Sequence, residues 1–102
     1  MNADADIQVW LETFARVRPS VIVPYIKSTE TRMLRYRLHT IKKGPQGRSE
    51  ISQGGVVNAP ADVPVALSRM SVNQGDNDEC LIDLTLSEAG HADRNYHFDC
   101  PR

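Results

Sequence analysis

Two segments of the chain alternate between apolar and polar residues with the two-residue period of a half-buried strand. From Met33 to Lys43, leucine and tyrosine side chains alternate with Arg35, Arg37 and His39. The segment from Cys80 to Leu86 repeats the pattern, with its apolar residues at every second position. Both segments are therefore predicted to be strands with one face in a core.

Turn-forming glycine and proline residues separate the other segments at short intervals, which indicates several short strands and an all-β sandwich or barrel. We expect strands near Ile7 to Phe14, Val21 to Ile26, Met33 to Lys42, Arg48 to Gly54, Val65 to Val72, Glu79 to Ser87 and Arg94 to Cys100. Pro24 lies inside the second of these. Because proline cannot donate to a ladder, we expect that strand to be an edge strand or a bulged one.

The first predicted strand has a competing interpretation. Its apolar residues also fit helical spacing, namely Ile7, Trp10, Leu11, Phe14 and Val17. Several of its other residues are good helix formers. The local pattern alone leaves helix and strand open.

Length and composition are those of one globular domain. The chain has 102 residues, of which 40% are hydrophobic and 25% charged, so a packed core is expected. We expect a single domain over residues 1–102, with residues 1–5 and 101–102 flexible. A formal net charge of -1 gives no overall attraction to nucleic acid or an anionic membrane, and we expect neither as a partner. The opening lacks the basic and apolar parts of a signal peptide, so the chain is expected to be cytosolic or already trimmed.

The two cysteines face one another if the last two strands form a hairpin with its turn near Gly90. The same register places apolar residues together, pairing Ile82 with Phe98 and Leu84 with Tyr96. A disulfide between Cys80 and Cys100 would contribute on the order of 3 kcal/mol. The alternative is two free thiols in a reducing compartment. Two cysteines at this separation make no metal site, and we expect no metal and no cofactor.

Basic side chains concentrate on the third predicted strand and the turn that follows it. Arg35, Arg37 and His39 share its outward face, and Lys42, Lys43 and Arg48 surround the turn. Acidic residues such as Glu79 are assigned to other segments. Such a patch can attract an acidic partner over roughly 8 to 10 Å at physiological salt. The other interpretation is an ordinary solvated strand face.

No motif typical of an enzyme is present. The sequence lacks a nucleophile elbow, a zinc-protease motif, a P-loop and a dinucleotide fingerprint. Its histidines have no nucleophile at a recognisable spacing. We therefore expect no catalytic residues and no enzymatic activity.

The ordered combination of several short patterns resembles the CsgC/CsgH family of curli chaperones. Gly47, Ser49 and Gln53 match a G-x-S-x-x-x-Q pattern, and a proline-bounded apolar segment follows from Ala59 to Asn73. Upstream, residues 21–24 resemble the apolar-proline step of the family's second strand. The similarity extends from about Ile7 to Phe98, although no single motif is decisive.

The resemblance implies a seven-stranded immunoglobulin-like sandwich, a periplasmic location and inhibition of amyloid formation by the major curlin subunit. It also favours a strand over a helix for the first segment. The Cys-x-Cys of the CsgC branch corresponds here to residues 32–34, which contain no cysteine, so the CsgH branch is the better match and redox chemistry is disfavoured.

We therefore expect a monomeric chaperone that makes transient, electrostatically guided contacts with an unfolded curlin subunit. The candidate contact residues are Arg35, Arg37, Lys42, Lys43 and Arg48. Ser49 and Gln53 share the parity of Ile51 in their strand, which favours a structural role for them. The alternative function is an immunoglobulin-like structural or adhesive subunit of a surface assembly, followed by a thiol oxidoreductase.

Overall fold

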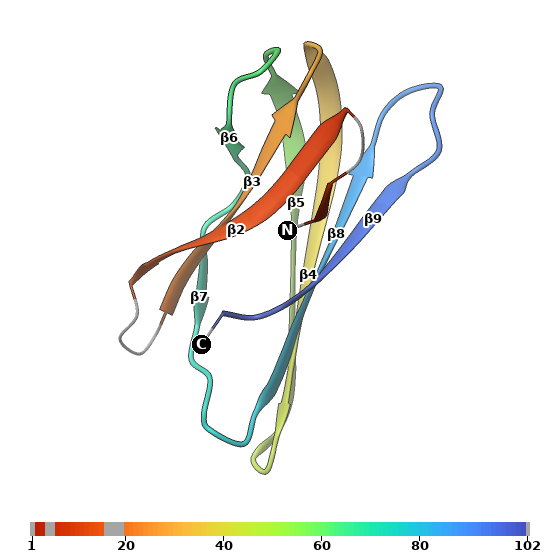
Figure 1. Ribbon diagram of the computed structural model, residues 1–102. Coiled ribbons are helices and arrows are strands. Elements are labelled where there is room, and N and C mark those ends of the chain that lie inside the picture. The colour runs from red at the N-terminus through yellow and green to blue at the C-terminus, as the bar shows by residue number, and fades with distance from the viewer. Residues whose placement is uncertain (1, 4–5, 16–19, 102) are drawn as a thin grey trace.

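The chain folds into two facing antiparallel sheets (Figure 1). The computed structural model describes residues 2–3, 6–15 and 20–101. Sheet A contains β1 (Asn2–Ala3), β2 (Ile7–Ala15), β3 (Ser20–Ser28), β6 (Val65–Ala66) and β7 (Met70–Val72). Sheet B runs in the order β5 (Gly47–Ala59), β4 (Arg32–Gly44), β8 (Glu79–Ser87) and β9 (Arg94–Asp99). The all-β prediction is confirmed, whereas the immunoglobulin-like arrangement stays a prediction.

The secondary structure of the described residues consists of strands and turns. No helix in residues 2–3, 6–15 or 20–101 is long and apolar enough to cross a membrane. The predicted flexibility of the ends falls partly on residues 1, 4–5 and 102, which lie outside the described residues. Within the N-terminal segment that was predicted to be flexible, Asn2 and Ala3 form β1 and pair with β2.

β2 is a strand, as the family resemblance predicted. Ile7 and Val9 are fully buried on its inner face. Trp10 lies on the outer face and stacks on Tyr25 of β3, with ring centroids 5.7 Å apart. Phe14 is 60% exposed on the same side of the strand. Apolar residues on both faces of β2 explain why its pattern also fits helical spacing.

The prediction that Pro24 marks an edge strand is wrong, and the register shift in the β2–β3 ladder lies between Thr13 and Ala15 of β2 instead of at Pro24. β3 lies inside sheet A, with β2 on one side and β6 and β7 on the other. The Pro24 carbonyl accepts a hydrogen bond from the Leu67 N–H at 2.9 Å, so the backbone groups of Pro24 point away from β2. Its missing N–H therefore faces residues 67–69, where the neighbouring strand is interrupted between β6 and β7. The ladder with β2 loses no hydrogen bond.

Two other predicted strands differ in extent from those observed. The strand expected to end at Gly54 continues as β5 to Ala59, paired with β4 over its whole length. The strand expected from Val65 to Val72 is split into β6 and β7. β8 has the predicted bounds, and the remaining strands differ by a few residues at their ends.

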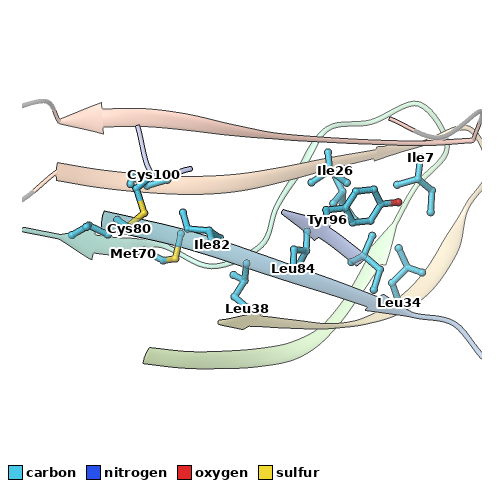
Figure 2. Packing of buried hydrophobic residues seen from close by; sticks show 14 of the residues in the cluster. Ile7, Ile26, Leu34, Leu38, Met70, Cys80, Ile82, Leu84, Tyr96 and Cys100 are labelled. Atoms are coloured by element: carbon cyan, nitrogen blue, oxygen red, sulfur yellow. A yellow bond between two sulfur atoms is a disulfide. The ribbon is translucent and has the colours of Figure 1, made fainter. Parts of the chain in front are cut away.

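The core lies between the two sheets and is filled by aliphatic side chains (Figure 2). Leu34 and Leu38 of β4 point inward together with the even-numbered residues of β8. β2, β3 and β7 supply the facing layer. The most deeply buried large side chains are Ile7, Ile22, Ile26, Leu34, Leu38, Ile82, Leu84 and Leu86.

The predicted register of the β8–β9 hairpin is confirmed. Ile82 lies opposite Phe98 and Leu84 opposite Tyr96. Cys80 and Cys100 form a disulfide, with their Cα atoms 5.3 Å apart. The Cys100 N–H also donates to the Cys80 carbonyl at 3.0 Å. One end of this hairpin is therefore held by both a disulfide and a backbone hydrogen bond between the same two residues.

A buried arginine connects the two sheets at the opposite end of that hairpin. The side chain of Arg32 is only 9% exposed. Its Nη2 lies 2.9 Å from Asp6 Oδ2, its Nη1 lies 3.0 Å from Glu88 Oε1, and its Nε donates to Ser28 Oγ. Arg94 holds both oxygens of Asp6, at 2.7 and 2.9 Å. Asp6 precedes β2 of sheet A, whereas both arginines belong to sheet B, so the cluster joins the layers.

The contribution of the disulfide to stability can be tested by replacing both cysteines. The variant Cys80→Ala with Cys100→Ala should lose about 3 kcal/mol of unfolding free energy, because the unfolded chain is no longer constrained by the loop. Urea denaturation of the oxidised protein and the variant measures the difference. Equal midpoints with equal slopes would contradict a stabilising disulfide.

The Asp6 cluster predicts a pH-dependent stability. The hydrogen bonds from Arg94 lower the pKa of Asp6 to about 2, below its value in an unfolded chain. Because the folded pKa is depressed, the contribution is complete above the unfolded value of about 4 and is lost as the pH falls toward 2. Asp6→Asn should reduce unfolding free energy by about 1 to 2 kcal/mol at neutral pH.

Urea titrations of the protein and of Asp6→Asn at pH 7 and at about pH 2 measure this contribution. The two proteins should converge in stability at the lower pH, where the wild-type carboxyl also becomes protonated. A difference that is independent of pH would assign the loss to packing instead of charge. Asp62→Asn is a suitable control, because Asp62 is an exposed aspartate in the segment between β5 and β6.

Candidate functional site

The outer face of sheet B carries two exposed arginines on β4. Arg35 lies between Val56 of β5 and Ser87 of β8, and Arg37 lies between Gly54 and Thr85. All of these neighbours are small or short. The two guanidinium groups are therefore not covered by adjacent strands and are accessible from the solvent.

An open groove of about 540 Å³ surrounds these two arginines. It extends from the free side of β5 across β4 to β8 and to Asp93 in the loop before β9. Its walls come from both faces of β5, because Ser52 and Gly54 point outward whereas Gln53 and Gly55 point inward. The groove thus passes around the edge of the sheet where β5 has two successive glycines.

The two glycines have different reasons to lack a side chain. A Cβ at Gly55 would lie 3.1 to 3.2 Å from the ring and hydroxyl of Tyr36. The Tyr36 hydroxyl is in turn 2.8 Å from Ser68 Oγ, between β6 and β7. Gly55 therefore gives Tyr36 room to reach the other sheet. A Cβ at Gly54 would lie 3.1 Å from the Tyr36 carbonyl oxygen, and its absence leaves the outer face beside Arg37 open. Adjacent glycines within a strand are a known sign of such close approach.

The basic residues near the β4–β5 turn form a second, separate group. Lys43 and Arg48 are direct partners across the hairpin. Arg48 contacts the carboxylate of Glu50, and His39 Nε2 lies 3.9 Å from the same side chain. Glu79 of β8 is the partner of Lys43 on its other side. The charge around the turn is consequently mixed, with opposite charges in neighbouring strands.

This arrangement corrects the expectation of one continuous basic patch. Glu79 was assigned away from the basic strand, but β8 places it beside Lys43 on the same face. Asp83 of β8 is the partner of His39 and contacts His97 of β9. Pairing of β4 with β8 brings Glu79 and Asp83 onto the basic face. The local sequence of β4 does not show that these acidic residues are its neighbours. Two basic groups remain, separated by acidic side chains.

Lys42 does not belong to the outer face. It has the parity of Leu38 and points to the inner side of β4, where its Nζ donates to the Asn73 carbonyl at 2.6 Å. The side chain therefore ties the long hairpin to the segment after β7. Of the predicted contact residues, Arg35, Arg37, Lys43 and Arg48 share the outer face and Lys42 does not.

Ser49 and Gln53 occupy inward positions on β5, with the parity of Ile51, as the sequence indicated. The β4–β5 hairpin extends beyond β2 and β3 (Figure 1), so its inward side is partly uncovered. Ser49 is exposed and Ile51 is 51% exposed. Gln53 is half-buried, and its Oε1 has no hydrogen-bond partner among the described residues. A structural role for Ser49 and Gln53 stays a prediction.

The described residues contain no group of three His, Cys, Asp or Glu side chains placed to hold a metal ion. The features of the site are instead an exposed sheet face, a free strand edge and two arginines beside an open groove. The fold and this face define a small disulfide-bonded β-sandwich with a charged outer surface.

A family model described as thin aggregative fimbriae synthesis protein, Tafi-CsgC, matches residues 1–94. The chain belongs to this family, and the predicted CsgC/CsgH relationship is confirmed.

Curated relatives carry the name curli assembly protein CsgC. The protein of Escherichia coli strain K12 is 28% identical over 67 residues, which are 66% of this chain and 61% of the relative. The protein of Salmonella arizonae is 30% identical over 66 residues, with 65% and 61% covered. The match thus spans about three fifths of these relatives (61%).

Two solved structures share the fold. The Escherichia coli curli protein CsgC superposes with a TM-score of 0.78 at 23% identity, covering 90% of this chain and 97% of that one. The solution structure of R. palustris CsgH gives a TM-score of 0.72 at 20% identity, covering 91% of each chain. Both likenesses extend over nearly the whole sandwich.

Proposed function

We propose that this protein is a non-enzymatic periplasmic chaperone of curli assembly that delays amyloid formation by the major curlin subunit. Its family is one of thin aggregative fimbriae synthesis, and its relatives are named for curli assembly. The disulfide between Cys80 and Cys100 supports an oxidising compartment, in agreement with the periplasm. We also propose that it acts as a monomer.

The observation that carries the proposal is the pair of exposed guanidinium groups of Arg35 and Arg37 beside the open groove. Arginine donates to a carboxylate through two parallel N–H groups, which gives such contacts geometric specificity. The groove contains one carboxylate, Asp93, against these two cations. An acidic segment of an unfolded client is therefore the ligand class that the groove suits best.

Brief contacts suffice for this function. An amyloid nucleus requires several extended segments to pair in register, so a binder that occupies early species lowers the concentration of pairing-competent chains. Electrostatic steering raises the rate of encounter without requiring a deep pocket. Lys43 and Arg48 would add to the steering at longer range, although their neighbouring acids reduce it.

Charge reversal at the groove tests the electrostatic contact. Arg35→Glu with Arg37→Glu should raise the protein concentration needed for half-inhibition of curlin fibrillation about tenfold, because steering and the carboxylate contacts are both lost. Dye fluorescence of fibrillating curlin measures the effect. The inhibition by the unmodified protein should also weaken with added salt.

A matched control separates this site from overall charge. Arg37→Glu and Arg69→Glu change the net charge equally, but Arg69 is exposed between β6 and β7 and belongs to the other sheet. Only Arg37→Glu should reduce inhibition. Equal effects of the two variants, or full inhibition by the folded double variant, would contradict the proposal.

A further inference from the structure

β5 is a long strand with a partner on one side only among the described residues. It pairs with β4 from Gly47 to Ala59 and ends the order of sheet B. The other end of that sheet is β9, which has 6 residues against the 13 of β5. A strand of this length at a sheet edge offers a row of backbone donors and acceptors to an extended chain.

The registers fix which residues of β5 offer those groups. The Cys100 N–H donates to the Cys80 carbonyl, so the even-numbered residues of β8 bond to β9 and the odd-numbered ones bond to β4. The same alternation makes even-numbered β4 residues bond to β5. The backbone N–H and C=O groups of the odd-numbered β5 residues therefore bond to β4. Those of Ser52, Gly54 and Val56 point to the free edge.

This edge also lies within reach of an arginine. Gly54 is the direct partner of Arg37 and has no side chain, so nothing on β5 stands between Arg37 and a strand added beside it. The added strand would lie two strand spacings from β4, about 10 Å. An extended arginine and an acidic side chain together bridge that distance. A carboxylate opposite Gly54 would thus meet the guanidinium group on the outer face.

We propose that the free edge of β5 accepts an extended acidic segment of the client as an added antiparallel strand. Backbone hydrogen bonds to Ser52, Gly54 and Val56 would hold the segment, and an Asp or Glu opposite Gly54 would pair with Arg37. This inference rests on the proposed function and adds to it the docking edge, the register and the ligand chemistry. A docked segment has one edge occupied, so it is less able to pair with other client chains.

Charge favours this occupant over a second copy of the protein. The groove at this edge contains Arg35 and Arg37. The acidic residue of β5 is Glu50, which already contacts Arg48, and the outward residues Ser52, Gly54 and Val56 are uncharged, so a second β5 strand offers these arginines no unpaired carboxylate. Docking to β9 is also disfavoured. Its outward residues are Asn95, His97 and Asp99. His97 already contacts Asp83, and the carboxylate of Asp99 would repel an acidic segment.

Proline substitution can block the edge without breaking the sheet. Ser52→Pro removes an N–H that faces the free edge and leaves the ladder with β4 intact. We expect about a tenfold loss of inhibitory potency against freshly unfolded major curlin subunit, since ordinary backbone hydrogen bonds are lost. Asn95→Pro, at the corresponding free edge of β9, should retain potency. Val56→Pro provides a second block if Ser52→Pro does not fold, as judged by circular dichroism.

Amide hydrogen exchange provides the direct readout. Adding the curlin subunit should protect the amides of Ser52, Gly54 and Val56 from exchange. A curlin variant in which acidic residues are replaced by the matching amides, Glu by Gln or Asp by Asn, should protect them less. Loss of inhibition on charge reversal, with full potency in Ser52→Pro and no amide protection, would overturn edge docking and leave the proposed function in place. Protected amides without any delay of fibrillation would overturn the proposed function and support docking. Protection in the protein alone, with a dimer in light scattering, would overturn the acidic-segment occupant.

Discussion

The structure depends on the alternation of β4, the strand on which both the core and the candidate site are built. Leu34 and Leu38 enter the core, and the arginines between them face the solvent. A shift of register by one residue would place Arg35 and Arg37 in the core and the leucines in water, at a cost of many kilocalories per mole. The apolar core therefore fixes the positions of the guanidinium groups, and β5 and β8 on either side fix their neighbours.

Those parts of the fold with one buried and one exposed face could be predicted from the sequence. β4 and β8 show a clear period of two, and the β8–β9 register followed from matching apolar residues around one turn. β5 was predicted too short because Gly54 and Gly55 were interpreted as a strand end. In the structure they are interior positions, and their lack of a side chain serves Tyr36 and the groove. Local composition does not distinguish these two uses of glycine.

The candidate site was only partly predictable, because its character comes from pairing between distant segments. The outward direction of Arg35 and Arg37 follows from parity alone. The acidic partners of Lys43 and His39 are Glu79 and Asp83 of β8. They lie about forty residues further along the chain, so no local pattern reveals them. Lys42 was included because it lies near the turn together with Lys43 and Arg48, yet neighbours in a strand point to opposite faces. The same parity rule that located the arginines places Lys42 on the inner side of β4.

The disulfide and the ion pair of Arg94 with Asp6 lie at the β8–β9 side of sheet B, and the proposed docking edge is on the other side. The disulfide holds one end of the β8–β9 hairpin, and Arg94 with Asp6 and Arg32 holds the opposite end. β5 has neither, and it is attached through its ladder with β4 and the packing of a few side chains such as Val57. Proteins commonly protect long edges with charges, as Arg48 and Glu50 do near the hairpin turn. From Ser52 to Val56 the outward side chains are small or apolar, so this stretch keeps an accessible backbone while the other side of the sandwich supplies the rigidity.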